Sequence, residues 1–109
     1  MVPMLVMIGC LRGGGVGGVV RGPEGKALQG ATVSWTADGE DSTAATAVDG
    51  TFRVMLENLS TFRSASLTVS LDGYQTARED IGDGPWDCTV TLQPLNAAVV
   101  SAITCKNLE

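Results

Sequence analysis

The 109-residue chain is 44% apolar and 17% charged, carries a net charge of −5 and contains no histidine, and its length suits one domain with a two-sheet core. The lack of His excludes His-based acid–base catalysis, Ser-His or Cys-His nucleophile pairs, and the usual zinc ligand sets. The seven Lys and Arg are scattered, so there is no basic stripe for nucleic acid, and no apolar run approaches the roughly 20 residues that span a bilayer.

Residues 1–9 are nearly all apolar and lead directly into Cys10, so we interpret them as the remnant of a signal peptide. The sequence MIGC at 7–10 resembles a bacterial lipobox, in which a small residue precedes a Cys that is lipidated and becomes the new N-terminus. The Gly-rich stretch that follows is typical of a flexible tether, so we assign residues 10–17 to a lipidated Cys and its tether. Two alternatives remain open. The start is truncated or wrongly placed and Cys10 is an ordinary thiol, or residues 4–8 form a strand at the sandwich edge.

The next segments have the spacing of short strands in an all-β sandwich. A first strand is expected at 18–21, followed by a turn in which Pro23 presets its φ angle and glycines take positive φ. In the second strand, at 31–37, Ala31, Val33 and Trp35 share one face and hydroxyl residues occupy the other. Trp35 is therefore expected to pack in the core.

Five further strands are expected, at 43–48, 51–56, 66–71, 74–80 and 87–93. Asp49-Gly50 is a hairpin signal between two of them, and Pro94 ends the last because it cannot donate to a ladder. The segment 95–109 is expected to be a C-terminal extension, whose apolar stretch at 97–100 could add an edge strand. The sequence thus predicts a seven-stranded β-sandwich over residues 18–94.

The alternation within these strands predicts which side chains are buried. The expected core residues are Val20, Leu28, Val33, Phe52, Val54, Leu67, Val69, Leu71, Val90 and Leu92. The residues expected on the outside are Thr32, Arg53, Thr68 and Thr91.

Five short motifs occur in a distinctive order: GVV at 18–20, LQGATV at 28–33, VDGTF at 48–52, LTVS at 67–70 and GY at 73–74. Together they resemble the carboxypeptidase regulatory-like domain, a transthyretin-like seven-stranded β-sandwich, over about residues 17–94. The resemblance implies a non-catalytic module of the kind found beside peptidase domains, at the front of outer-membrane receptors and in small lipoproteins. It carries no catalytic residue onto this sequence. The chain departs from the family at 57–63, where members often have a compact Pro-Gly turn.

Two acidic groups could suggest calcium, because carboxylates close together in loops can coordinate Ca²⁺. They are Asp38, Glu40 and Asp41, and Glu79, Asp80, Asp83 and Asp87. Neither has the spacing of a calcium loop, so we predict solvated turns and no metal site.

Trp86 follows Gly-Pro in a loop, where a Trp either covers the core or contacts a ligand. It is the best single candidate for ligand contact. Cys88 and Cys105 are the two thiols outside the signal region, and in an exported chain they favour a disulfide worth about 3 kcal/mol in the chain-entropy model. The alternative for Cys88 is a buried free thiol, since its strand parity points inward.

These observations predict a non-enzymatic accessory or adhesion-type module without a cofactor. Its expected location is extracytoplasmic, in the periplasm or on the cell surface of a bacterium, with lipidated Cys10 as its membrane anchor. The alternative is a carbohydrate- or peptide-binding module that uses loop aromatics, Trp86 first. Its partner would be a protein or a glycan, and nucleic acid is not expected.

Overall fold

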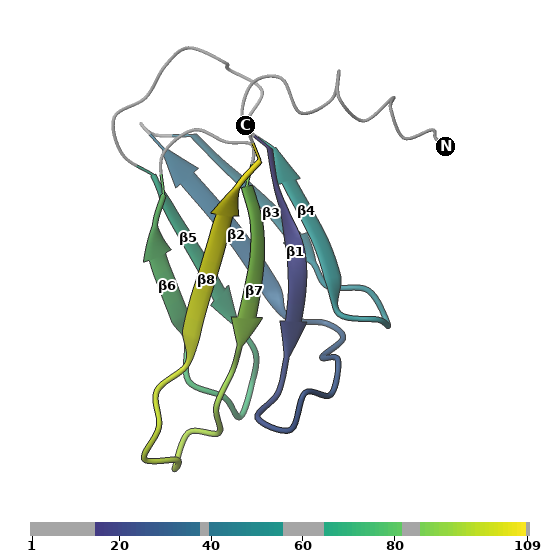
Figure 1. Ribbon diagram of the computed structural model, residues 1–109, viewed down its shortest axis with the longest axis vertical. Coiled ribbons are helices and arrows are strands. Elements are labelled where there is room, and N and C mark those ends of the chain that lie inside the picture. Colours follow the sequence, from purple (N-terminus) through teal and green to yellow (C-terminus); the bar gives the residue numbers. More distant parts are fainter. Residues whose placement is uncertain (1–14, 38–39, 56–64, 82–85, 109) are drawn as a thin grey trace.

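The computed structural model describes residues 15–37, 40–55, 65–81 and 86–108 of the chain. These residues form a sandwich of two four-stranded sheets, so the predicted all-β fold is confirmed (Figure 1). Within these ranges no helix is long and apolar enough to cross a membrane.

One sheet, called here the β1 sheet, has the strand order β4-β1-β7-β8. Its strands β1 and β7 run parallel, and its other pairs are antiparallel. The bounds are Gly15–Arg21 for β1, Thr51–Met55 for β4, Trp86–Thr91 for β7 and Ala102–Asn107 for β8.

The second sheet, called the β2 sheet, has the order β3-β2-β5-β6 and is antiparallel throughout. The bounds are Thr32–Ala37 for β2, Glu40–Ala45 for β3, Ser66–Ser70 for β5 and Ala77–Asp80 for β6. Small hydroxyl side chains dominate its outward positions, which suits exposed strand surface.

The core lies between the two sheets and follows the predicted alternation. Trp35 and Leu67 are fully buried, as expected. Leu28 and Leu71 are only half-buried, because each lies in a connection just outside a strand rather than between the sheets. Of the four residues expected outside, Thr32 and Arg53 are exposed, whereas Thr68 and Thr91 are half-buried.

Strand β1 begins at Gly15, three residues earlier than predicted. Gly15 pairs with Met55 and Val16 with Val54, so the end of the expected tether belongs to the sheet. The signal-peptide and Cys10 predictions concern residues outside the described part of the chain. The unusual connection at 57–63 also lies outside it.

Strand β3 lies at Glu40–Ala45 instead of 43–48. Residues 40–42, expected in a polar turn, belong to this strand, and Glu40 pairs with Ala37. At its C-terminal end, β3 stops at Ala45 because the next residue, Thr46, is a buried polar residue that bonds to another segment. Its Oγ1 accepts a hydrogen bond from the Ala31 amide at 2.9 Å and donates one to the Leu28 carbonyl at 2.6 Å. Thr46 therefore stabilises the connection that leads into β2 and does not extend β3.

The segment expected as an extension supplies an eighth strand, β8, at Ala102–Asn107 rather than at 97–100. Gln75 explains the offset. Its Nε2 donates to the carbonyls of Pro94, Ala97 and Val99, and its Oε1 accepts from the Ser101 amide. Because this side chain binds the backbone of the connection, pairing with β7 resumes only at Ala102.

Candidate functional site

Trp86 is the first residue of β7 and is half-buried against the core. It borders a hollow of about 560 Å³ on the β1 sheet. The lining residues come from β1, β4, β7 and the end of the chain: Gly17, Gly18, Val19, Thr51, Phe52, Arg53, Trp86, Asp87, Thr89 and Leu108. The residue singled out from the sequence as a ligand contact thus borders a hollow that a ligand could enter.

The strand register places two opposite charges on either side of this hollow. Gly17 pairs with Arg53 of β4 on one side and with Asp87 of β7 on the other. Both side chains are exposed. Since neighbouring strands lie about 4.8 Å apart, the Cα atoms of Arg53 and Asp87 are ~10 Å apart with a glycine between them. Two residues further along β1, Val19 pairs with Thr51 and Thr89, so the next row across the sheet carries hydroxyl groups.

The two central glycines of β1, Gly17 and Gly18, differ in whether packing requires a glycine at that position. A Cβ at Gly18 would overlap the carbonyl oxygen of Cys88, so the close approach of β7 requires glycine there. A Cβ at Gly17 would lie 3.5 Å from the carbonyl oxygen of Phe52, an ordinary contact. Packing therefore requires Gly18 but not Gly17, and the missing side chain of Gly17 leaves the hollow open.

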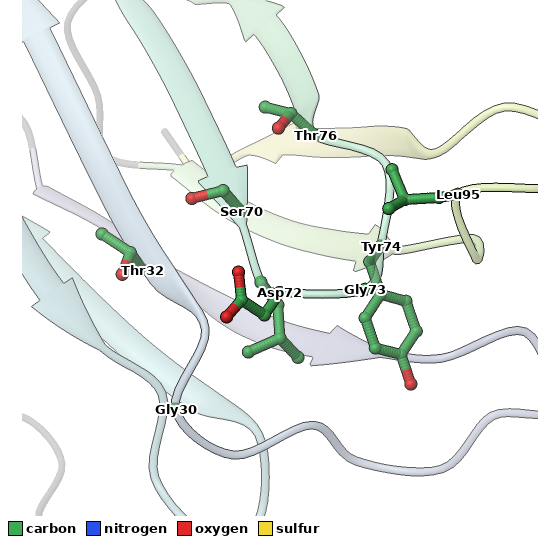
Figure 2. A pocket seen from close by; sticks show the side chains of 9 residues that line it. Gly30, Thr32, Ser70, Asp72, Gly73, Tyr74, Thr76 and Leu95 are labelled. Atoms are coloured by element: carbon green, nitrogen blue, oxygen red, sulfur yellow. The ribbon is translucent and has the colours of Figure 1, made fainter.

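A second hollow, of about 490 Å³, lies where β2 and β5 meet the connections at the other end of the sandwich (Figure 2). It is bordered by the hydroxyl residues Thr32, Ser70 and Thr76 and by Asp72. Tyr74 also borders it, but its ring points away from the Asp72 carboxylate. No aromatic surface and charged group converge here on one point.

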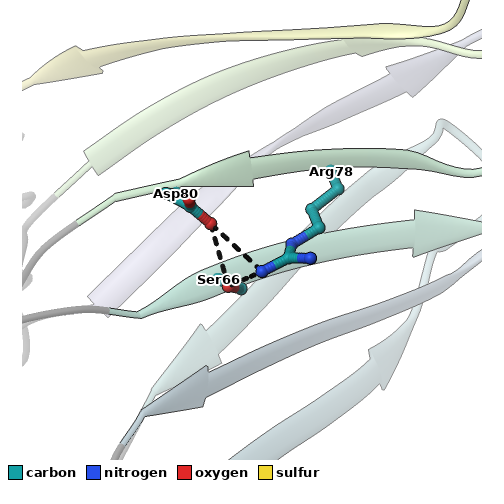
Figure 3. Close-up of polar contacts among 3 residues, drawn as sticks. All are labelled: Ser66, Arg78 and Asp80. Carbon is teal, nitrogen blue, oxygen red and sulfur yellow. Dashed lines mark hydrogen bonds and ion pairs between the residues drawn. The ribbon is translucent and has the colours of Figure 1, made fainter.

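A third polar group lies on the outer face of the β2 sheet (Figure 3). Arg78 donates to the Ser66 hydroxyl at 2.9 Å, Ser66 donates to the Asp80 carboxylate at 3.0 Å, and Arg78 and Asp80 form an ion pair at 3.4 Å. These groups satisfy one another in solvent, where such a pair contributes about 0–1 kcal/mol.

The described members of the two acidic groups considered for calcium do not gather at one site. Asp38, the side chain of Glu40 and Asp83 lie outside the described part of the chain. Asp80 belongs to the β2 sheet and Asp87 to the β1 sheet. Among the described residues, no three His, Cys, Asp or Glu side chains gather in a way that could hold a metal ion.

Cys88 and Cys105 face each other across β7 and β8 and are joined by a disulfide. Their Cα atoms are 4.0 Å apart, and the S–S distance is 2.01 Å. Cys88 is fully buried and Cys105 half-buried, so the bond closes the core side of the sheet's last strand pair.

The fold is thus an all-β sandwich module whose described residues show no assembled metal site. The family model of the carboxypeptidase regulatory-like domain matches residues 15–104, and the chain belongs to this family. The match begins at the first residue of β1 and extends into β8, so it covers nearly the whole sandwich. No curated protein matches the chain.

Sequence reasoning placed Gly17 in the tether and did not single out Arg53 as a site residue. The signal for both was weak, because their proximity depends on the pairing of β1 with β4 and β7. Only the glycine itself, at an outward position of β1, indicated a place where a ligand could approach the backbone closely.

Proposed function

We propose that this chain is an exported, non-catalytic accessory module, held at a membrane by lipidated Cys10. The observation that carries the proposal is the Cys88–Cys105 disulfide. Disulfides persist in oxidising compartments and are rare in the cytosol, so this bond supports an extracytoplasmic location. The lack of His in the sequence supports a non-catalytic role.

The arrangement of the strands suits an anchor of this kind. Strand β1 begins at the end of the sandwich where β7 also begins and β8 ends (Figure 1). A tether attached ahead of Gly15 leaves the sandwich at this end. The connections around Gln75 lie at the opposite end and would face away from the membrane.

The test is fractionation of cells that express the full chain. The wild-type protein should sediment with membranes, whereas Cys10→Ala should move to the soluble extracytoplasmic fraction with an unchanged melting temperature. The neighbouring variant Leu11→Ala is the matched control and should stay with membranes. A Cys10→Ala protein that still sediments with membranes would contradict the proposal.

A second candidate function is ligand binding at the hollow beside Trp86. The observation in its favour is that the exposed groups of Arg53 and Asp87 border the same hollow as this aromatic residue. The ligand class left open by the sequence is a carbohydrate or a peptide, and loss of binding in Trp86→Ala would support either. Because Trp86 also packs against the core, the melting temperature of that variant must be measured alongside.

A further inference from the structure

The hollow on the β1 sheet combines two exposed charges of opposite sign. Within the described ranges, neither Arg53 nor Asp87 forms an ion pair, and the ion pair described there joins Arg78 to Asp80 instead. Arg53 lies on the edge strand β4 and Asp87 on the inner strand β7, so Gly17 separates them. At ~10 Å between Cα atoms, two strand spacings, they bracket the hollow rather than meet across it.

Lys106 is the other charged residue in this row, since it pairs with Asp87 from β8. It lies on the side of Asp87 away from Gly17 and forms no ion pair with it in the structure. It leaves the carboxylate open toward the hollow. The exposed Lys106 ammonium nearby will nevertheless weaken the binding of a cationic group to Asp87.

The remaining borders offer hydrogen bonds and apolar contact. In the next row, Thr89 provides a hydroxyl group, and the Thr51 hydroxyl, which donates to Asp49, can still accept a hydrogen bond. Val19 lies between them and is half-buried, so it adds a small apolar surface. A ligand seated here would meet a guanidinium at one side, a carboxylate at the other, and hydroxyls and a small apolar surface in between.

We propose that this hollow binds a short peptide through both of its charged termini. Arg53 binds the terminal carboxylate, for which a guanidinium provides a matching pair of donors, and Asp87 accepts hydrogen bonds from the terminal ammonium. An extended peptide advances about 3.5 Å per residue, so two or three residues span the gap between the two side chains. A neutral glycan is the less favoured ligand, because it carries no charge to pair with the guanidinium or the carboxylate.

This inference deepens the second candidate function and is independent of the anchoring proposal, which the fractionation experiment tests separately. It also assigns a purpose to Gly17, since an extra side chain at this position would occupy the hollow without disturbing the packing beneath it.

The test is a titration of the folded, disulfide-bonded protein, followed by amide chemical shifts. The probe is tri-alanine with free termini. The comparison ligands are N-acetyl-tri-alanine amide, which lacks both charges, and cellotriose, a neutral glycan. We expect tri-alanine to shift the amides of Gly17, Thr51 and Thr89, and the capped peptide to leave them in place. The shifts should weaken with added salt, because the charges are exposed.

Three variants sharpen the test. Arg53→Gln should weaken tri-alanine binding about tenfold, equivalent to about 1.4 kcal/mol for one exposed charged contact. Gly17→Val should abolish binding while keeping or raising the melting temperature, because a β-branched residue replaces glycine in a strand. Arg78→Gln, on the other sheet, is the matched control and should bind as the wild type does.

The proposal is overturned if tri-alanine shifts none of these amides, if the capped peptide binds equally well, or if cellotriose binds in its place. It is also overturned if a folded Gly17→Val protein binds tri-alanine normally. Should that variant fail to fold, the Arg53→Gln result decides alone, and unchanged binding there counts against the proposal.

Discussion

The outer faces of the two sheets differ in whether their charged side chains pair with one another. On the β2 sheet, Arg78 and Asp80 neutralise each other through Ser66, and hydroxyl side chains cover the neighbouring strands. On the β1 sheet, Arg53 and Asp87 stand apart with a glycine between them. The same kinds of side chain thus give a self-satisfied surface on one face and an open pair of charges on the other. Charge spacing set by strand register, rather than composition, distinguishes the two faces.

The largest effect should come from the core that both faces share, and it tests whether the sheets differ only on their outer sides. Phe52 belongs to the β1 sheet and Leu67 to the β2 sheet, and both are buried. Phe52→Ala and Leu67→Ala should each lower the free energy of unfolding by about 2–5 kcal/mol, from lost transfer energy and the cavity left behind. Denaturant unfolding measures this, with exposed Thr43→Ala as a control expected within about 0.5 kcal/mol. A small loss for one of the pair would show that the two inner faces are not equivalent.

The disulfide belongs to the β1 sheet alone, and its loss should destabilise the protein by about 3 kcal/mol in the chain-entropy model. The bond closes a loop with a sequence separation of 17. When the protein is expressed in an oxidising compartment, its intact mass should rise by two hydrogens on reduction. The double variant Cys88→Ala/Cys105→Ala should unfold at a lower denaturant concentration. Free thiols at both positions after expression in that compartment would refute the pairing.

The adjacent glycines Gly17 and Gly18 of β1 should respond differently to substitution by alanine. Gly18→Ala should destabilise by about 1–3 kcal/mol, because the new Cβ overlaps the Cys88 carbonyl and forces β1 and β7 apart. Gly17→Ala should be neutral or slightly stabilising. Thermal unfolding of the two variants compares them directly, and equal losses at both positions would mean that packing, not an open hollow, explains Gly17.

The smallest effect concerns Asp49, in the connection between β3 and β4. The hydroxyl and amide of Thr51 donate to its carboxylate at 2.6 Å and 3.1 Å, and these bonds lower its pKa below the ordinary value of 3.8. A lowered folded-state pKa adds stability that is full above the unfolded value and is lost as pH falls through the folded value. Asp49→Asn should therefore melt slightly below the wild type at about pH 6, and the difference should shrink toward about pH 2. A difference that grows on acidification would contradict this sign.

Alternation and turn residues were enough to predict the sandwich and most of its core, because a strand with one buried face must repeat with period two. They could not predict where β3 ends, since Thr46 has the same strand preference as its neighbours and departs only because Leu28 and Ala31 need its hydroxyl. Register was also out of reach. The alternation places Arg53 on an outer face but does not say which residue from a distant strand lies beside it.

The parallel pairing of β1 with β7 has a consequence for how the chain reaches its fold. Val16 and Trp86 are partners although nearly the whole sandwich separates them in sequence. The first strand therefore has β4 as its only neighbour until the seventh has been synthesised, and all-β folds dominated by such long-range pairings form slowly, in about milliseconds to seconds. The β1 sheet therefore completes only after β7 has been synthesised. Joining the end of β8 to the start of β1, which lie at the same end of the sandwich (Figure 1), gives a circular permutant in which β1 follows β7 closely in sequence, and this permutant should fold faster than the wild type.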